Sequence, residues 1–402
     1  MLEGVDLVKE SCDVLILSAS YGGGHNQVAR ALTLALQMQA PGIRITTVDY
    51  CDLLVPFFNR ITQFGYAQSI RHFPVGYALY YQATGKISPD SFWQRHLNRM
   101  GYTELTMLVG NLRPRIIIST FPLPAGVLSE MKETGNLNVP IVTVITDMCV
   151  HSQWIHPNTD LYIVGSPEVA DGLVERGVSR SAIIVSGIPI RPEFNSNFDP
   201  IELKKKFNYK PHEKVILIMG GSDGIFKATR FRLSRTLEEL PLGVQALIIT
   251  GSNHDLYEKL QPLESRYANF RVEKFTENMP SLMRIADLLI TKAGGITISE
   301  ALASGLPMII YKPMMGQEEV NANYLWRHRA AIIAKTEHRV RSATHRMVSD
   351  EQFRLFFQKN CIKIGHPGSA EMAARSILNM LTPETRRVRR FNNNKARSLI
   401  CV

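Results

Sequence analysis

Short apolar runs rich in Val and Ile recur along the chain, and stretches with the spacing of amphipathic helices separate them. Continuous apolar runs that alternate with helices are typical of parallel strands covered on both faces of a sheet. The pattern restarts at residue 214, after a proline-rich junction near 190–200. We therefore predict an α/β protein with two doubly wound parallel-sheet domains facing a cleft. The expected strands are 12–18, 43–48, 115–120, 139–146, 160–165, 182–186, 214–219, 244–250, 270–275, 286–291 and 306–311.

The size and charge of the chain suggest how it divides. Its 402 residues, 45% of them apolar, suffice for two or three cores. We place the domains at 1–195 and 196–385, followed by a basic tail at 386–402. The chain has a net charge of +10, and the tail holds six Lys or Arg residues and no acidic residue. Such a tail can contact nucleic acid, anionic lipid or only water.

Three features narrow the class of protein. No apolar run reaches the roughly 18 residues that a membrane span needs. The N-terminus lacks the layout of a signal peptide, so we expect an intracellular protein. The five cysteines are dispersed with no C-x-x-C spacing, which argues against a structural zinc site.

Glycine turns follow three of the expected strands, at Gly22–His25, Gly220–Gly224 and Gly294–Gly295. Ligands of doubly wound sheets bind at the carboxyl ends of strands, and a glycine turn before a helix offers backbone N–H groups to an anion. The first turn matches the dinucleotide fingerprint G-x-G-x-x-G only in part, because Gln27 takes the third glycine position, and the P-loop motif is absent. The turns indicate phosphate binding, with a nicotinamide enzyme as the less favoured alternative.

Polar residues near these turns suggest a chemistry. His25 stands where the first turn enters a helix, and imidazole is the commonest general base near neutral pH. The alternative role of His25 is that of a structural, hydrogen-bonded histidine. Ser222 in the second turn can bond a phosphate, and Thr297 after the third turn can donate a hydrogen bond. Glu300, in the helix that follows, can accept two ribose hydroxyls.

A further polar group, Gln317, Glu318 and Asn321, follows the expected strand at 306–311. Side chains of this kind can hold the hydroxyls of a sugar ring through paired hydrogen bonds. For Glu318 and Glu319 the alternative is favourable negative charge at a helix start.

Several ordered blocks resemble glycosyltransferase family 28, in particular the bacterial processive diacylglycerol glucosyltransferases and the plant monogalactosyldiacylglycerol synthases. The peptidoglycan-precursor N-acetylglucosaminyltransferases are a more distant branch. The blocks run from about residue 13 to 330 and are SASYGGGH, TDMCVHSQWIHPNTD, SGIPIRPEF, MGGSDG, ITKAGGITISEALASGLPMIIYKP and GQEEVNANY. The resemblance implies two Rossmann-like domains of the GT-B type, with a lipid acceptor in the first domain, a UDP-sugar in the second, and an inverting mechanism.

The resemblance also implies roles for individual residues. His25 matches the catalytic base, beside Gly24 of the first turn. Asp147, His151 and Trp154 match a block near the acceptor. The donor-binding positions are Gly221 and Ser222 for the diphosphate, Gly295 and Thr297 in the glycine turn, Glu300 for the ribose, and Gln317, Glu318 and Asn321 for the sugar.

Glycosyl transfer needs a base for the acceptor hydroxyl and positive dipoles for the leaving diphosphate, and helix N-termini supply such dipoles without a metal. The chain contains no D-x-D triplet, so we expect metal-independent transfer with no cofactor.

Residues 57–102 hold eleven of the 33 aromatic residues, together with five Lys or Arg residues. This composition suits an anionic membrane surface, and its alternative is ordinary helices packed on the sheet.

We therefore expect a peripheral enzyme at the cytoplasmic face of the cell membrane. It transfers a hexose, glucose in preference to galactose, from UDP-glucose or UDP-galactose to diacylglycerol. One alternative is a UDP-N-acetylglucosamine-dependent transferase acting on a polyprenyl-linked peptidoglycan precursor, and another is a UDP-sugar epimerase of the same fold. A nucleic-acid-binding module is the non-enzymatic alternative, but no RNA-binding motif accompanies the basic residues.

Overall fold

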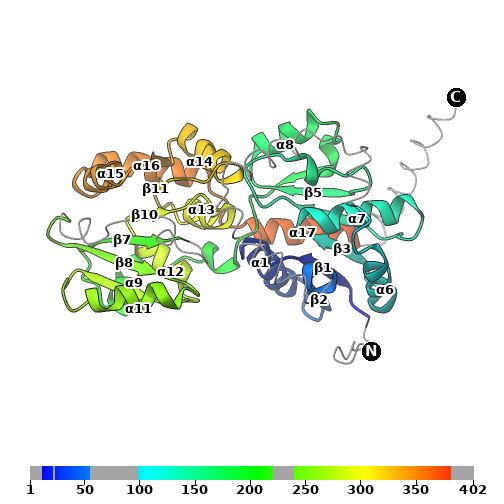
Figure 1. Ribbon diagram of the computed structural model, residues 1–402, viewed down its shortest axis with the longest axis horizontal. Coiled ribbons are helices and arrows are strands. Elements are labelled where there is room, and N and C mark those ends of the chain that lie inside the picture. Colours follow the sequence, from blue (N-terminus) through cyan, green and yellow to red (C-terminus); the bar gives the residue numbers. More distant parts are fainter. Residues whose placement is uncertain (1–10, 21–22, 55–97, 221–239, 382–402) are drawn as a thin grey trace.

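A computed structural model of the chain describes residues 11–20, 23–54, 98–220 and 240–381. The described residues form two six-stranded, all-parallel sheets, each flanked by helices (Figure 1). This confirms the predicted pair of doubly wound α/β domains. The first sheet has the order β2 (Ile45–Asp49), β1 (Val14–Ser18), β3 (Ile116–Ser119), β4 (Ile141–Val144), β5 (Leu161–Val164) and β6 (Ile183–Val185). The second has the order β12 (Ala331–Ala334), β11 (Met308–Tyr311), β10 (Leu288–Thr291), β7 (Lys214–Met219), β8 (Val244–Ile249) and β9 (Phe270–Glu273).

The strand order reverses at the first strand of each sheet. β1 pairs with β2 on one side and with β3 on the other, and β7 pairs in the same way with β8 and β10. In open α/β sheets, ligands bind beside the carboxyl ends of strands at such a reversal. The glycine turns after β1 and β7 therefore follow the two strands where a ligand site is expected.

Helices cover both faces of the sheets. In the first half they are α1 (Gly24–Gln39), α2 (Tyr50–Leu54), α6 (Tyr102–Leu112), α7 (Pro122–Glu133) and α8 (Pro167–Val174). In the second half they are α9 (Pro200–Lys206), α11 (His254–Leu260), α12 (Met279–Ile285), α13 (Gly295–Ala303), α14 (Gln317–Arg327), α15 (Glu337–Ser349), α16 (Glu351–Ile364) and α17 (Ser369–Leu381). Short 3-10 helices occur at η1 (Ser152–Trp154), η2 (Arg180–Ala182), η3 (Pro192–Asn195) and η4 (Gln261–Leu263).

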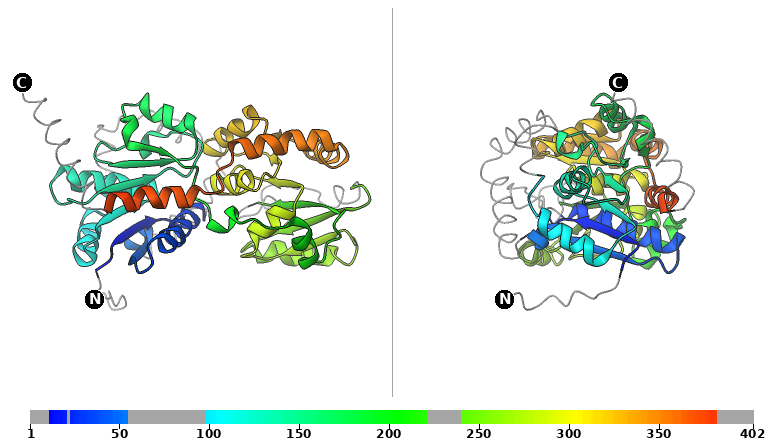
Figure 2. Two further views of the ribbon diagram at one scale, coloured as in Figure 1. Left: turned by 180° about the vertical axis from the view of Figure 1, so that it is seen from behind. Right: turned by 90° about the vertical axis from the view of Figure 1, so that its right-hand side faces the viewer.

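Helix α17 returns from the second half of the chain to the first sheet. It packs against α1, and it is the red helix beside β1 and β3 in Figures 1 and 2. Ile377 of α17 and Leu32 of α1 belong to one hydrophobic core, which also includes Ile188 and Ile190 of the junction between the domains. The division of the chain at 195 and 385 stays a prediction, and α17 shows that sequence order alone does not assign every helix to its sheet.

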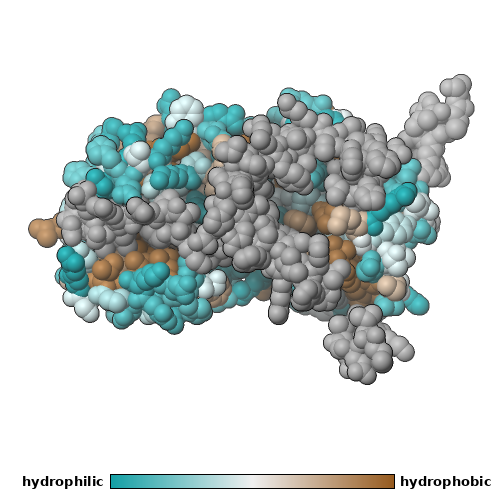
Figure 3. All heavy atoms as spheres, in the orientation of Figure 1, coloured by the Kyte–Doolittle hydropathy of each residue, from teal (hydrophilic) through white to brown (hydrophobic). Residues whose placement is uncertain are grey.

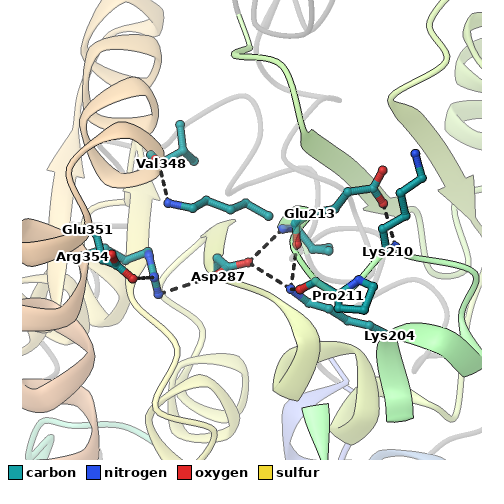
Figure 4. A network of polar contacts seen from close by, with 10 residues as sticks. Lys204, Lys210, Pro211, Glu213, Asp287, Val348, Glu351 and Arg354 are labelled. Atoms are coloured by element: carbon teal, nitrogen blue, oxygen red, sulfur yellow. Dashed lines mark hydrogen bonds and ion pairs between the residues drawn. The ribbon is translucent and has the colours of Figure 1, made fainter. Parts of the chain in front are cut away.

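A polar network lies at the amino ends of the strands of the second domain (Figure 4). The Asp287 carboxylate, just before β10, accepts a hydrogen bond from the Val215 backbone N–H at 3.0 Å. It also pairs with Lys204 of α9 and Arg354 of α16. These contacts tie two helices to the edge of the sheet opposite the glycine turns.

The surface of the described residues is mixed. On the face shown in Figure 3, most described side chains are hydrophilic, and hydrophobic ones lie in separate groups between them. Among the described residues, no helix is long and apolar enough to cross a membrane.

Candidate active site

His25 lies in the first turn of α1, the helix that follows the carboxyl end of β1. The turn requires a glycine at Gly23, whose φ of +73° is in the left-handed region. Nδ1 of His25 lies 2.6 Å from the carbonyl oxygen of Thr120, which can only accept a hydrogen bond. Nδ1 therefore carries the proton of the neutral ring, and Nε2 carries the lone pair of a base.

The surroundings of His25 favour its neutral form. Its ring contacts Phe121 edge-on, with 5.1 Å between ring centroids, and lies 6.3 Å from Trp154 of η1. Burial lowers the pKa of His25 to about 4, although the hydrogen bond to Thr120 and the charge of Asp49 act in the opposite direction. Imidazole in this place is therefore uncharged at neutral pH and able to accept a proton.

A chain of hydrogen bonds fixes the residues beside the first turn. Ser20 donates to the Asp49 carboxylate at the end of β2, and Asn26 of α1 donates to Ser20 Oγ at 3.0 Å. The hydroxyl of Ser18, the last residue of β1, donates a hydrogen bond to Oδ1 of Asn26. The start of α1 is thus held against two strand ends.

The third glycine turn faces the first across the domain interface. A Cβ atom on Gly24, at the start of α1, would lie 3.6 Å from the Ile296 side chain of α13. A Cβ atom on Gly295 would lie 1.9 Å from the carbonyl oxygen of Thr146, which follows β4. Because no side chain fits there, Gly295 allows the backbone of the first domain to reach the N-terminus of α13.

Glu300 lies one turn further along α13, with only 8% of its surface exposed. Burial raises its pKa to about 7, and the charge of Arg191 opposes this shift. Arg191 is itself buried, and its Nη1 donates at 3.1 Å to the Glu277 carbonyl oxygen and carboxylate. Arg191 lies within the SGIPIRPEF block, and no role was predicted for it.

The first turn of α14 brings further polar residues to the same region. Gln317, the first residue of α14, is partly exposed, as is Thr297 of α13. The Glu318 carboxylate accepts a hydrogen bond from the Met314 N–H at 3.1 Å. Burial raises the pKa of Glu318, and the charge of Lys292 partly offsets the shift. Asn321 is fully buried, and its amide contacts the first domain.

The expected acceptor block separates into three environments. Trp154 lies beside His25. His151 is buried at the start of η1 and accepts a hydrogen bond from the Gln153 N–H. Asp147 turns toward the second domain, where its carboxylate accepts a hydrogen bond from Asn321 Nδ2 at 3.1 Å. The structure therefore joins one residue of the block to the base and another to the expected donor side.

Some predicted residues lie outside the described part of the chain. They are Gly221 and Ser222 of the second glycine turn, most of the aromatic and basic segment 57–102, and the tail 386–402. The described residues contain no group of three or more His, Cys, Asp or Glu side chains placed to hold a metal ion.

Three residues that contact His25 were not predicted: Phe121, whose ring packs against the imidazole, and the two threonines Thr120 and Thr146. Both follow parallel strands of the first sheet, β3 and β4. Their positions could have indicated the contact, because the carboxyl ends of neighbouring parallel strands meet at one edge of a sheet.

The chain matches known sequence families in both halves. Residues 25–190 match the family described as monogalactosyldiacylglycerol (MGDG) synthase, and residues 215–361 match the glycosyltransferase family 28 C-terminal domain. The processive diacylglycerol beta-glucosyltransferase of Bacillus subtilis (strain 168) is 35% identical over 370 residues, which cover 91% of this chain and 94% of the relative. Its namesake from Bacillus licheniformis is 33% identical over 371 residues, with the same coverage of both chains.

Solved structures share the fold at low sequence identity. MurG of Acinetobacter baumannii is 17% identical with a TM-score of 0.59, covering 91% of this chain and 99% of its own. MnaA of S. aureus, solved with UDP, is 12% identical with a TM-score of 0.60, covering 93% and 98%. The architecture is that of the GT-B type, as predicted. With both halves matched and relatives aligned over most of its length, the chain is a glycosyltransferase and belongs to glycosyltransferase family 28.

Proposed function

We propose that the protein transfers a hexose, glucose in the first place, from a UDP-hexose to the hydroxyl of diacylglycerol. The transfer inverts the anomeric carbon and gives a β-glycosyldiacylglycerol, which the enzyme can extend with further sugars. The observation that carries the proposal is the 35% identity, over 91% of the chain, to a processive diacylglycerol beta-glucosyltransferase. The neutral imidazole of His25 beside the domain interface supports it, because inverting transfer needs a base on the acceptor side.

In this mechanism Nε2 of His25 takes the proton of the diacylglycerol hydroxyl while that oxygen attacks the anomeric carbon. The new bond joins the carbon to the acceptor oxygen, and the bond to the diphosphate oxygen breaks, with its electron pair leaving on UDP. A bound diphosphate brings negative charge close to the ring, which raises the pKa of His25 from its low value in the free enzyme. The base thereby gains proton affinity when substrate is present.

The second domain holds the donor. In the proposed arrangement the Glu300 carboxylate accepts hydrogen bonds from the two ribose hydroxyls. The N-terminus of α13, with Gly295 and Thr297, faces the diphosphate. Gly221 and Ser222 contribute further amide and hydroxyl donors. The sugar hydroxyls contact Gln317 and Glu318 of α14.

We also propose that transfer requires no metal ion or cofactor. The charge that develops on the leaving diphosphate is stabilised by backbone N–H groups and by the positive end of α13. The absence of a D-x-D triplet from the sequence supports this proposal.

The acceptor is a membrane lipid, so the enzyme must work at a bilayer surface. We propose peripheral binding at the cytoplasmic face through anionic lipid, with the aromatic and basic segment 57–102 as the contact. Nucleic acid is not a partner in this proposal.

The test is transfer of radiolabelled sugar from UDP-glucose, UDP-galactose and UDP-N-acetylglucosamine to diacylglycerol vesicles, with the products separated by size. We expect labelled glycolipid from UDP-glucose, and longer products at long times. Transfer only from UDP-N-acetylglucosamine to a polyprenyl-linked precursor would favour the peptidoglycan alternative. Conversion of the UDP-sugar without any lipid would favour an epimerase.

A further inference from the structure

The three residues Thr146, Asp147 and Met148 contact both the base and the second domain. Thr146 Oγ1 lies 3.3 Å from Nδ1 of His25, within the first domain. The carbonyl oxygen of Thr146 packs against Gly295 at the start of α13. Asp147 and Met148 bond Asn321 of α14. A segment of three consecutive residues therefore joins His25 to the two helices expected to hold the donor.

Asn321 uses its whole amide in this contact. Its Oδ1 accepts a hydrogen bond from the Met148 N–H at 2.8 Å, and its Nδ2 donates to Asp147 Oδ1 at 3.1 Å. The second hydrogen on Nδ2 points to the carbonyl oxygen of Ala293 at 3.0 Å, just before the glycine turn of α13. Because the side chain is 0% exposed, water cannot replace these partners while the domains stay together. One amide thus binds two residues of the first domain and the donor-side turn.

The charges in this contact favour an amide at position 321. Burial raises the pKa of Asp147, and the hydrogen bond from Asn321 opposes the shift. The charge of Asp147 also raises the pKa of Glu318, so the two carboxylates lie close enough to repel each other. A neutral donor between the domains can satisfy Asp147 without adding a further charge.

We propose that Asn321 is a positioning residue, which holds segment 146–148 against the second domain and, through Thr146, fixes the imidazole of His25. In this arrangement the contact with the donor-holding domain adds Thr146 to the Thr120 carbonyl, which already orients the imidazole within the first domain. The expected donor-sugar role of Asn321 differs from this one, because a positioning residue acts through His25 and need not touch the sugar.

The first experiment compares Asn321→Ala with Asn323→Ala in the transfer assay, and this readout rests on the proposed function. Asn323 lies on the same helix with an exposed side chain and serves as the matched control. For Asn321→Ala we expect a fall in kcat of about 10²-fold, the size that a small misplacement of a catalytic group can cause. The Kd for UDP-glucose, measured by calorimetry, should change by less than about threefold. Asn323→Ala should change neither kcat nor Kd. An unchanged kcat with a large rise in Kd would overturn the proposal and make Asn321 a donor ligand.

The second experiment places Asn321→Ala in a His25→Ala background. If Asn321 acts through the imidazole, the double variant is no slower than His25→Ala alone. Thr146→Val tests the same path from the other side, since it removes only the hydroxyl near Nδ1. It too should lower kcat, and it should have no further effect when His25 is absent. Losses that multiply would show independent action and sink the proposal.

A third readout needs no transfer activity. The Met148 N–H donates to Asn321, so Asn321→Ala should speed hydrogen exchange at Met148, while Asn323→Ala should not. If wild-type enzyme transfers no sugar to diacylglycerol but Met148 loses protection as expected, the proposed function fails and the domain contact stands. Unaltered exchange at Met148 in Asn321→Ala would overturn the contact itself.

Discussion

Nδ1 of His25 lies 2.6 Å from the carbonyl oxygen of Thr120, at the carboxyl end of the neighbouring strand. This contact fixes the tautomer of the ring and leaves Nε2 as the basic nitrogen. A backbone carbonyl cannot take part in proton transfer, so it orients the imidazole without competing for its proton. The end of β3 therefore supplies the orientation and the tautomer of the proposed base, and burial supplies its neutral state.

Replacement of His25 by alanine should lower kcat by about 10²–10⁴-fold, the usual contribution of a positioned general base. The Kd for UDP-glucose should change little, because the base is proposed to contact the acceptor. Steady-state kinetics and calorimetry measure the two quantities. Near-normal turnover in His25→Ala would remove His25 from the mechanism.

The pH profile of kcat/KM reports the pKa of the base in the free enzyme. Because burial lowers the pKa of His25 to about 4, the neutral form dominates over most of the acid range. In Glu300→Gln, which lacks a carboxyl group that titrates near neutral pH, we expect kcat/KM to stay level from about pH 8 to pH 5 and to fall only as the pH approaches 4. An acid limb centred near the ordinary histidine pKa, about 6.5, would contradict this environment.

Gly295→Ala should destabilise the protein, because the added Cβ would meet the Thr146 carbonyl oxygen at 1.9 Å. Relief requires the domains to separate or the backbone to shift, and overpacking of this kind costs about 1–3 kcal/mol. Gly294→Ala is the matched control for stability, since its Cβ would meet no described atom within 4 Å and its φ is −70°. Thermal unfolding of the unliganded variants measures the difference. Equal melting temperatures would show that the contact is not close in solution.

Glu300→Gln should change stability in a pH-dependent way. The pKa of Glu300 is raised from 4.5 to about 7, so the folded protein binds this proton more tightly than the unfolded chain. Stability from this group is present below pH 4.5 and is lost as the pH rises toward 7. At pH 8 the unliganded variant should exceed wild type by up to roughly 3 kcal/mol in free energy of unfolding, and at pH 4 the two should agree.

Urea unfolding at both pH values tests this, with the exposed Glu319→Gln as control. The same Glu300→Gln variant should bind UDP more weakly, because it loses a carboxylate acceptor for the ribose hydroxyls. Tight UDP binding by the variant would separate Glu300 from the donor site.

Treatment with EDTA should leave the transfer rate within about twofold, because fixed dipoles rather than a divalent ion are proposed to stabilise the leaving diphosphate. The assay is sugar transfer before and after dialysis against the chelator. A lost rate that returns on addition of Mg²⁺ or Mn²⁺ would contradict metal-independent transfer.

Periodicity predicted the fold well because each buried strand must be continuously apolar. All eleven expected runs are strands, but β12 (Ala331–Ala334) was missed. The strand has only four residues and lies between stretches with basic residues, so its apolar run is too short to predict a strand. The return of α17 to α1 could not be predicted either, since an amphipathic helix shows which face it buries but not which partner covers it.

The site divides in a similar way. Glycine turns and the charged or polar residues after them are visible in sequence, which is why His25, Gly295 and Glu300 could be chosen. Contacts between domains depend on how two separately recognisable folds meet. The pairing of Asp147 with Asn321 joins residues 174 positions apart, and no local pattern encodes it.

The return of α17 has a consequence for biosynthesis. The apolar face of α1 is made early, but Ile377 and its neighbours, which cover that face, leave the ribosome more than 300 residues later. Until then, the N-terminal half has an incomplete core, and the apolar face of α1 is exposed. The core of the first domain is therefore complete only after residues 369–381 have been made, which links correct folding of the half that contains His25 to synthesis of the second domain.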